Sequence, residues 1–187
     1  SLFSLLPAFV ITEIMKCWTV DEIHPEFRPT AQLLLLTCGL FPGMIVTLRM
    51  DMLMCMFIIL SLYTFYKMEK REDKRRKNTI LFPIYIFLAI FTKGPLGLLI
   101  PLLSIFAYLL LTKRIRQFSC YWGWKTWSIL LSCCIIWFSL SYLEGGSGYL
   151  HNMLFHQTFG RAIHSFHHEA PFYYYCIAIW YSMFPWS

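Results

Sequence analysis

Seven long apolar segments separated by short polar ones dominate this sequence. A lone helix needs about 20 apolar residues to cross a bilayer, and shorter segments cross when they pack inside a bundle. Hydrophobic residues make up 58% of the chain and charged residues only 14%, a balance that excludes an ordinary water-soluble domain. The sequence therefore predicts an all-α fold, a polytopic transmembrane bundle of about seven helices that forms a single domain over residues 1–187. The apolar segments are residues 2–15, 29–48, 52–66, 79–92, 96–112, 126–143 and 172–186.

The basic residues indicate how the bundle is oriented. The formal net charge is +6, and Lys and Arg concentrate in residues 67–77 and 113–116, between apolar segments. Such loops face the cytoplasm under the positive-inside rule, so the positive net charge is explained by membrane orientation and does not indicate a nucleic-acid partner. Counting helices from these loops also places residues 20–28 in the cytoplasm, where the acidic pair Asp21 and Glu22 is interpreted as part of a solvated connector.

The same count places three polar segments together on the outer face. They are the turn at residues 48–51, the break at residues 93–95 and the long segment 144–171, which we expect to open with a flexible glycine-rich stretch at residues 144–148.

Arg49 and Asp51 occupy the first of these outer segments. A mutual salt bridge or simple solvation of the turn is one interpretation. The alternative is that Asp51 orients a catalytic group or a substrate hydroxyl, while Arg49 supports a negatively charged headgroup.

Lys93 follows a very apolar segment and precedes Gly94 and Pro95, which are expected to begin the next helix. A cation beside the free N–H groups of a helix start predicts an anion site, such as one for phosphate. The alternative is that this lysine only extends toward the aqueous interface.

The outer segment 151–169 is unusually rich in imidazoles. A metal site at His164, His167, His168 and Glu169 is one interpretation, but the spacing matches no compact ligand motif, so no metal or other cofactor is predicted. A plain interfacial loop is a second, and recognition of phosphate or sugar hydroxyls is favoured. The polar residues are His151, His156, Gln157, Arg161, His164, His167, His168 and Glu169.

A substrate with a phosphate headgroup and a long lipid tail suits this combination of outer cations and a hydrophobic bundle. Inversion at a sugar carbon would also need a carboxylate base near the acceptor hydroxyl and cations near the departing phosphate. Besides Glu144 and Glu169, Asp51 is the only outer carboxylate next to the bundle.

Three motifs carry a family resemblance that runs over residues 27–186. The runs TLRMDMLM at 47–54, FTKGPLGL at 91–98, and QTFGR at 157–161 with SFHHEAPFYYY at 165–175 resemble the bacterial protein-mannosyltransferase and lipid A aminoarabinose-transferase group. This group belongs to the C-type glycosyltransferase superfamily.

The resemblance implies a multi-pass enzyme of the inner (plasma) membrane with part of the C-type fold. It would transfer a sugar from a polyprenyl-phosphate donor to a glycan, lipid or protein acceptor on the extracytoplasmic face. Asp51 would have a supporting catalytic role, because the family's principal acid lies in a first outer loop. We expect that loop, the first helix and a C-terminal part to be missing from this chain.

The resemblance also implies binding roles. The donor phosphate would be bound by Lys93, Arg161, His164, His167 and His168. Other substrate contacts would come from Arg49, His156, Gln157 and Glu169. A transporter or flippase for lipid-linked saccharides and a non-catalytic assembly subunit remain as alternatives, although a transporter should carry polar residues at mid-membrane depth, where these segments are apolar.

Overall fold

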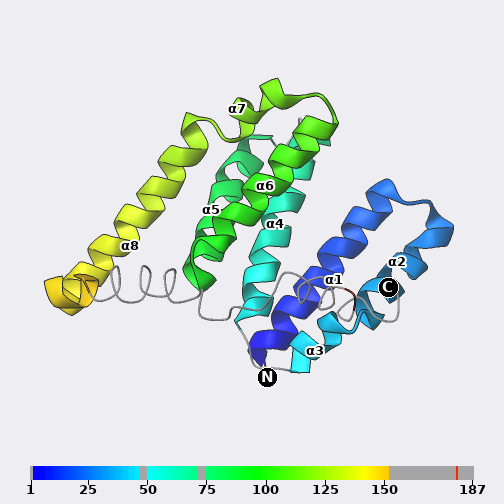
Figure 1. Cartoon of the computed structure of the whole chain (residues 1–187), viewed down its shortest axis with the longest axis horizontal. Helices are drawn as coiled ribbons and strands as arrows, with labels where there is room; N and C mark the ends of the chain where they lie inside the picture. The colour runs from blue at the N-terminus through cyan, green and yellow to red at the C-terminus, as the bar shows by residue number, and fades with distance from the viewer. Residues whose placement is uncertain (1, 47–49, 71–74, 152–179, 181–187) are drawn as a thin grey trace.

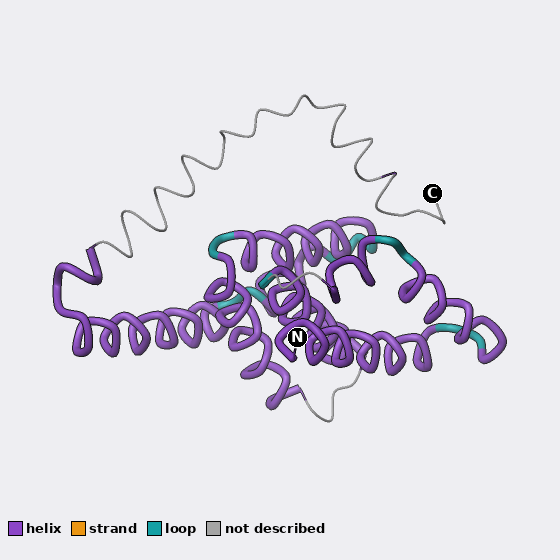
Figure 2. Tube along the Cα trace, turned by 90° about the horizontal axis from the view of Figure 1, so that it is seen from below, coloured by secondary structure: helices purple, strands orange, loops and turns teal. Residues whose placement is uncertain are grey.

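The computed structural model describes residues 2–46, 50–70, 75–151 and 180, and the regular elements among them are all helical (Figures 1 and 2). This confirms the all-α prediction for the described part of the chain. The helices are α1 (Leu2–Glu22), α2 (Arg28–Thr37), α3 (Leu40–Val46), α4 (Asp51–Lys70), α5 (Arg75–Lys93), α6 (Leu96–Leu111), α7 (Phe118–Tyr121) and α8 (Trp124–His151), with short 3-10 helices at Pro25–Phe27 and Ile115–Gln117.

Helix α4 lies at the centre of the bundle and contributes to apolar cores on two of its sides. On one side it packs against α1, with α2 and α3 beyond, and on the other against α5 and α6, while α8 packs against α5 (Figure 1). Met52 and Met56 of α4 pack with Ala8 and Ile11 of α1. The second core joins α4 to the following helices through Phe65, Met68, Phe82, Ile86, Ile105, Leu109, Tyr121, Trp122 and Leu130.

Two helices in the described residues are long and apolar enough to cross a membrane. They are Asp51–Lys70 and Ile115–Leu143, the second of which takes in the short 3-10 helix, α7 and most of α8. A third results if residues 25–46 count as one bent span. This finding is compatible with a membrane protein, and it supports two or three of the seven predicted spans. The last predicted segment, 172–186, lies outside the described residues apart from Trp180.

The expected single helix over residues 29–48 is instead two helices, α2 and α3, bent by 55°. Pro42 explains the break, because a helical proline has no N–H to donate and its ring would clash with the carbonyl four residues earlier, at Cys38. Cys38 accordingly has extended backbone, with ψ of 119°.

The bent pair still follows α1 along its whole length. At one end, Arg28 donates hydrogen bonds to the carbonyls of Ile23 and Val20 at 3.1 and 2.9 Å, which satisfies free carbonyls at the end of α1. At the other end, the hydroxyl of Ser4 donates to the carbonyl of Ile45 at 2.8 Å. Residues 25–46 therefore return from the last turn of α1 to its first.

The prediction that residues 144–148 form a flexible stretch is wrong. Helix α8 continues through it and ends at His151. Each glycine costs a helix about 1 kcal/mol relative to alanine. An existing helix can extend through such residues without the free-energy cost of nucleation, which a separate helix would have.

Candidate functional site

Asp51 and Lys93 form an ion pair at one end of the bundle, here called the Asp51/Lys93 end. The ammonium of Lys93 donates to Oδ1 of Asp51. Asp51 is the first residue of α4 and Lys93 is the last residue of α5, so each charge stabilises the end of its own helix dipole. The antiparallel packing of α4 on α5 brings the two residues together.

The turn after Lys93 fixes where this lysine lies. Gly94 ends α5 with a positive φ of 88°, and its N–H donates to the carbonyl of Ile90 at 2.6 Å. Pro95 then occupies the N-cap position of α6. The predicted break at residues 93–95 is thus confirmed. Lys93, however, belongs to the end of α5 and contacts Asp51, whereas the sequence suggested the start of the next helix as its neighbour.

The two partners differ in exposure, which decides what the pair can do. The Asp51 side chain is 16% exposed and that of Lys93 is 48% exposed. A partly solvated pair of this kind contributes about 0–1 kcal/mol, so an incoming phosphate can compete for the ammonium. The carboxylate, which is mostly covered, is positioned to orient that lysine or to accept a hydrogen bond from a hydroxyl.

Sequence reasoning missed this pairing. It placed both residues on one face but considered Arg49 as the partner of Asp51. One feature of the sequence could have indicated the pairing. Both residues were expected at helix ends on the outer face, and two helix lengths of chain separate them.

The other predicted site residues lie outside the residues that the structure describes, so their roles stay predictions. They are Arg49, His156, Gln157, Arg161, His164, His167, His168 and Glu169.

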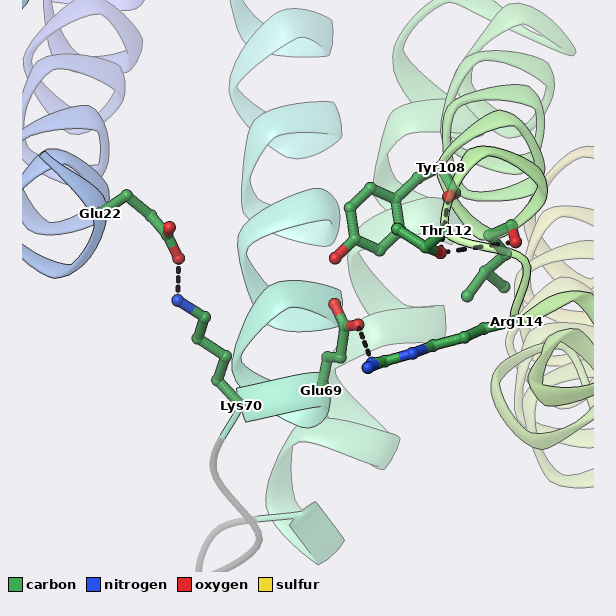
Figure 3. Close-up of polar contacts among 7 residues, drawn as sticks. Glu22, Glu69, Lys70, Tyr108, Thr112 and Arg114 are labelled. Carbon is green, nitrogen blue, oxygen red and sulfur yellow. Dashed lines mark hydrogen bonds and ion pairs between the residues drawn. The ribbon is translucent and has the colours of Figure 1, made fainter.

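A second group of ion pairs lies at the opposite end of the bundle, here called the Glu22/Lys70 end (Figure 3). Glu22 accepts hydrogen bonds from Lys70 and, at 2.6 Å, from the hydroxyl of Tyr66. These two donors, Lys70 first, lower the pKa of Glu22, which lies beyond the apolar part of α1. Glu22 is solvated as expected, since its side chain is 42% exposed, but it is the last residue of α1 and links that helix to α4, so it does not belong to a connector.

Arg114 makes the other contact at the Glu22/Lys70 end. Its guanidinium donates to Oε1 of Glu69 at 3.2 Å, and the Glu69 side chain is 12% exposed (Figure 3). Aromatic rings extend this layer, since the centroid of Trp18 lies 5.3 Å from that of Tyr66. These contacts join α1, α4 and the segment after α6.

Within the described ranges, no three His, Cys, Asp or Glu side chains lie close enough to hold a metal ion. Comparison of the chain with protein-family models, with curated proteins and with solved structures gave no match. A functional proposal therefore depends on the sequence motifs and on the contacts described above.

Proposed function

We propose that this chain belongs to a multi-pass glycosyltransferase of the bacterial inner membrane, which transfers a sugar from a polyprenyl-phosphate donor to an acceptor on the extracytoplasmic face. One observation carries the proposal. The ion pair between Asp51 and Lys93 joins two of the three motifs on which the family resemblance depends, 47–54 and 91–98. Residues that are distant in the chain thus form one polar site at one end of an apolar bundle.

The distribution of charged contacts supports the proposed orientation. The Glu22/Lys70 end includes Arg114, from the basic segment 113–116, and the positive-inside rule assigns that end to the cytoplasm. The Asp51/Lys93 end would then lie outside, at the level of the donor headgroup. The seven-helix arrangement, with residues 172–186 as its last span, is part of this proposal.

The residues have distinct roles in the proposed transfer. Lys93, with Arg161, His164, His167 and His168, would bind the donor phosphate and stabilise the negative charge that develops as it departs. Asp51 would keep Lys93 in place and support the acceptor hydroxyl. Sugar and acceptor contacts would come from Arg49, His156, Gln157 and Glu169.

The contacts in the middle of α4 favour this enzyme over a transporter. The buried hydroxyl of Ser61 donates to the carbonyl of Ile58 at 2.7 Å, and that of Thr64 to Leu60 at 2.7 Å. Both hydroxyls are satisfied within their own helix. A translocation path should instead present polar groups to a substrate at this depth.

Substitution of the proposed phosphate ligands tests this function. The whole gene product in membranes is assayed for transfer of labelled sugar from polyprenyl-phosphate donors and for donor affinity. We expect Lys93→Ala and Arg161→Ala each to weaken donor binding by about tenfold or more, because each removes a hydrogen bond to a charged group.

Lys70→Ala is the matched control, since it removes a lysine–carboxylate pair of the same kind at the Glu22/Lys70 end. It should leave donor affinity unchanged. Unchanged affinity in both Lys93→Ala and Arg161→Ala would refute the phosphate assignment. Wild-type protein that transfers sugar from no donor would instead support the transporter or the assembly subunit.

A further inference from the structure

A partly open cavity of about 260 Å³ lies at the Glu22/Lys70 end, away from Asp51 and Lys93. It is formed where the last turns of α4 and the first turns of α5 meet α7 and the start of α8. Its volume is just below the range of about 300–1,000 Å³ that is usual for sites of drug-sized ligands, so a small group fits it. Its lining residues are Met68, Thr79, Phe82, Cys120, Tyr121, Lys125 and Thr126.

The lining combines an apolar floor with one cation. Met68 and Phe82 are 6% and 1% exposed and belong to the core, whereas Lys125 is exposed. In the part of the chain that the structure describes, no carboxylate forms an ion pair with Lys125. An anionic group with an adjoining apolar portion would match this lining.

The surroundings of the cavity carry the same charge and the features of a membrane interface. Arg76 and Lys77, three and two residues before Thr79, are exposed. Trp124, next to Lys125, is 87% exposed, and tryptophan is enriched where lipid headgroups meet the hydrocarbon core. In the proposed orientation the cavity therefore lies at the headgroup level of the cytoplasmic leaflet, where anionic lipids are attracted to basic residues.

We infer that this cavity binds the phosphate headgroup of an anionic phospholipid from the cytoplasmic leaflet. Lys125 contacts the phosphate, and the apolar floor contacts the glycerol and the first carbons of the acyl chains. The inference uses the membrane orientation proposed above but not the sugar transfer, which takes place at the opposite end of the bundle.

Titration of the detergent-solubilised protein with short-chain lipids tests the site. The probes are phosphatidylglycerol, phosphatidylcholine and water-soluble glycerol 3-phosphate, and native mass spectrometry measures the bound fraction. We expect tighter binding of phosphatidylglycerol than of phosphatidylcholine, and weak binding of glycerol 3-phosphate. Lys125→Gln should weaken phosphatidylglycerol binding about fivefold, the effect of one basic residue at a membrane surface.

Two further variants separate a defined cavity from general attraction by charge. Lys77→Gln removes an exposed lysine at the same end, but outside the cavity, and should change the affinity by less than about twofold. Thr79→Phe keeps every charge but fills the cavity, so it should weaken binding as Lys125→Gln does. Helical content measured by circular dichroism checks that each variant is folded.

Equal losses in Lys125→Gln and Lys77→Gln would overturn the inference, because they would show attraction without a site. Equal affinity for the two lipids would overturn it as well. Glycerol 3-phosphate that binds as tightly as the lipid would show a site for a soluble phosphate ester instead. Sugar transfer is not measured in this experiment, so none of these results bears on the proposed glycosyltransferase.

Discussion

Lys113, directly after the C-cap residue of α6, has left-handed backbone, with φ of 56°. The hydrogen bonds around it form a Schellman motif: the N–H of Lys113 donates to Leu110 at 3.1 Å, and that of Arg114 donates to Leu109 at 2.8 Å. Glycine usually occupies this position because a Cβ atom is unfavourable there. Lys113→Gly should therefore raise the free energy of unfolding by about 0.5–1 kcal/mol, once the greater chain entropy of glycine is deducted.

Thermal unfolding in detergent, followed by circular dichroism, measures this effect. Lys113→Ala is the control, since it removes the charge and the long side chain but keeps the Cβ atom. It should give no gain in the unfolding midpoint. An equal gain in both variants would show that the charge, rather than the backbone conformation, is unfavourable at this position.

At the scale of single residues, the sequence predicted on which face of the bundle a charged residue lies better than it predicted which residue it pairs with. It placed Asp51 and Lys93 on one face, and the structure brings them into contact. It did not predict that contact, because the pairing of side chains depends on the axial position of α4 relative to α5. For the same reason Glu22 could not be paired with Lys70 in advance.

Helices α5 and α6 approach each other closely at Gly97. A Cβ atom there would lie 2.3 Å from the carbonyl carbon of Ala89 and 2.5 Å from its oxygen, and both belong to the backbone. Small residues permit such close packing between helices in membranes. Gly97→Ala would force the two helices apart, so we expect a loss of about 1–3 kcal/mol in the free energy of unfolding.

Gly43→Ala provides a matched control inside a helix. A Cβ atom at Gly43 meets nothing within 4 Å, and alanine favours a helix over glycine by about 0.5–1 kcal/mol. The two substitutions should therefore shift the unfolding midpoint in opposite directions in the same detergent assay. A rise of the midpoint in Gly97→Ala would contradict the packing described for α5 and α6.

At the scale of elements, apolar segments predicted where helices lie, but local signals did not always predict where they end. The break at residues 93–95 was predictable because a glycine that adopts positive φ and a proline act together there. At Cys38 the signal was weaker, since Pro42 disrupts the helix one turn before its own position. At residues 144–148 the glycines predicted a helix end, yet α8 extends through them.

At the scale of the molecule, α4 has the dimensions of a span. Its 20 residues, at a rise of about 1.5 Å each, match a hydrocarbon core about 30 Å thick. Charged pairs lie at both of its ends: Asp51 with Lys93 at one, and Lys70 with Glu22 at the other. The sequence predicted these two polar ends from the basic segments. The sequence did not predict how α1 and α5 pack on α4, because that packing depends on contacts between residues distant in the chain.

Thiol labelling of intact cells tests the orientation of this span. In a variant whose seven cysteines are replaced, Met50→Cys places a thiol at a position that is 72% exposed, directly before α4. Arg116→Cys places another at an exposed position near Arg114, at the opposite end. A membrane-impermeant maleimide should label Met50→Cys in intact bacteria, and should label Arg116→Cys only after permeabilisation, because a helix that crosses the bilayer separates the two positions.

The reverse labelling pattern would place Asp51 and Lys93 in the cytoplasm. The headgroup of a donor used on the extracytoplasmic face could not reach them there, so the glycosyltransferase proposal would fail at its geometric basis. The phospholipid cavity would then face the outer leaflet, where the cytoplasmic excess of anionic lipid no longer argues for its occupant. Labelling of both thiols in intact cells would instead show that α4 does not separate two compartments, and both proposals would lose the orientation that they share.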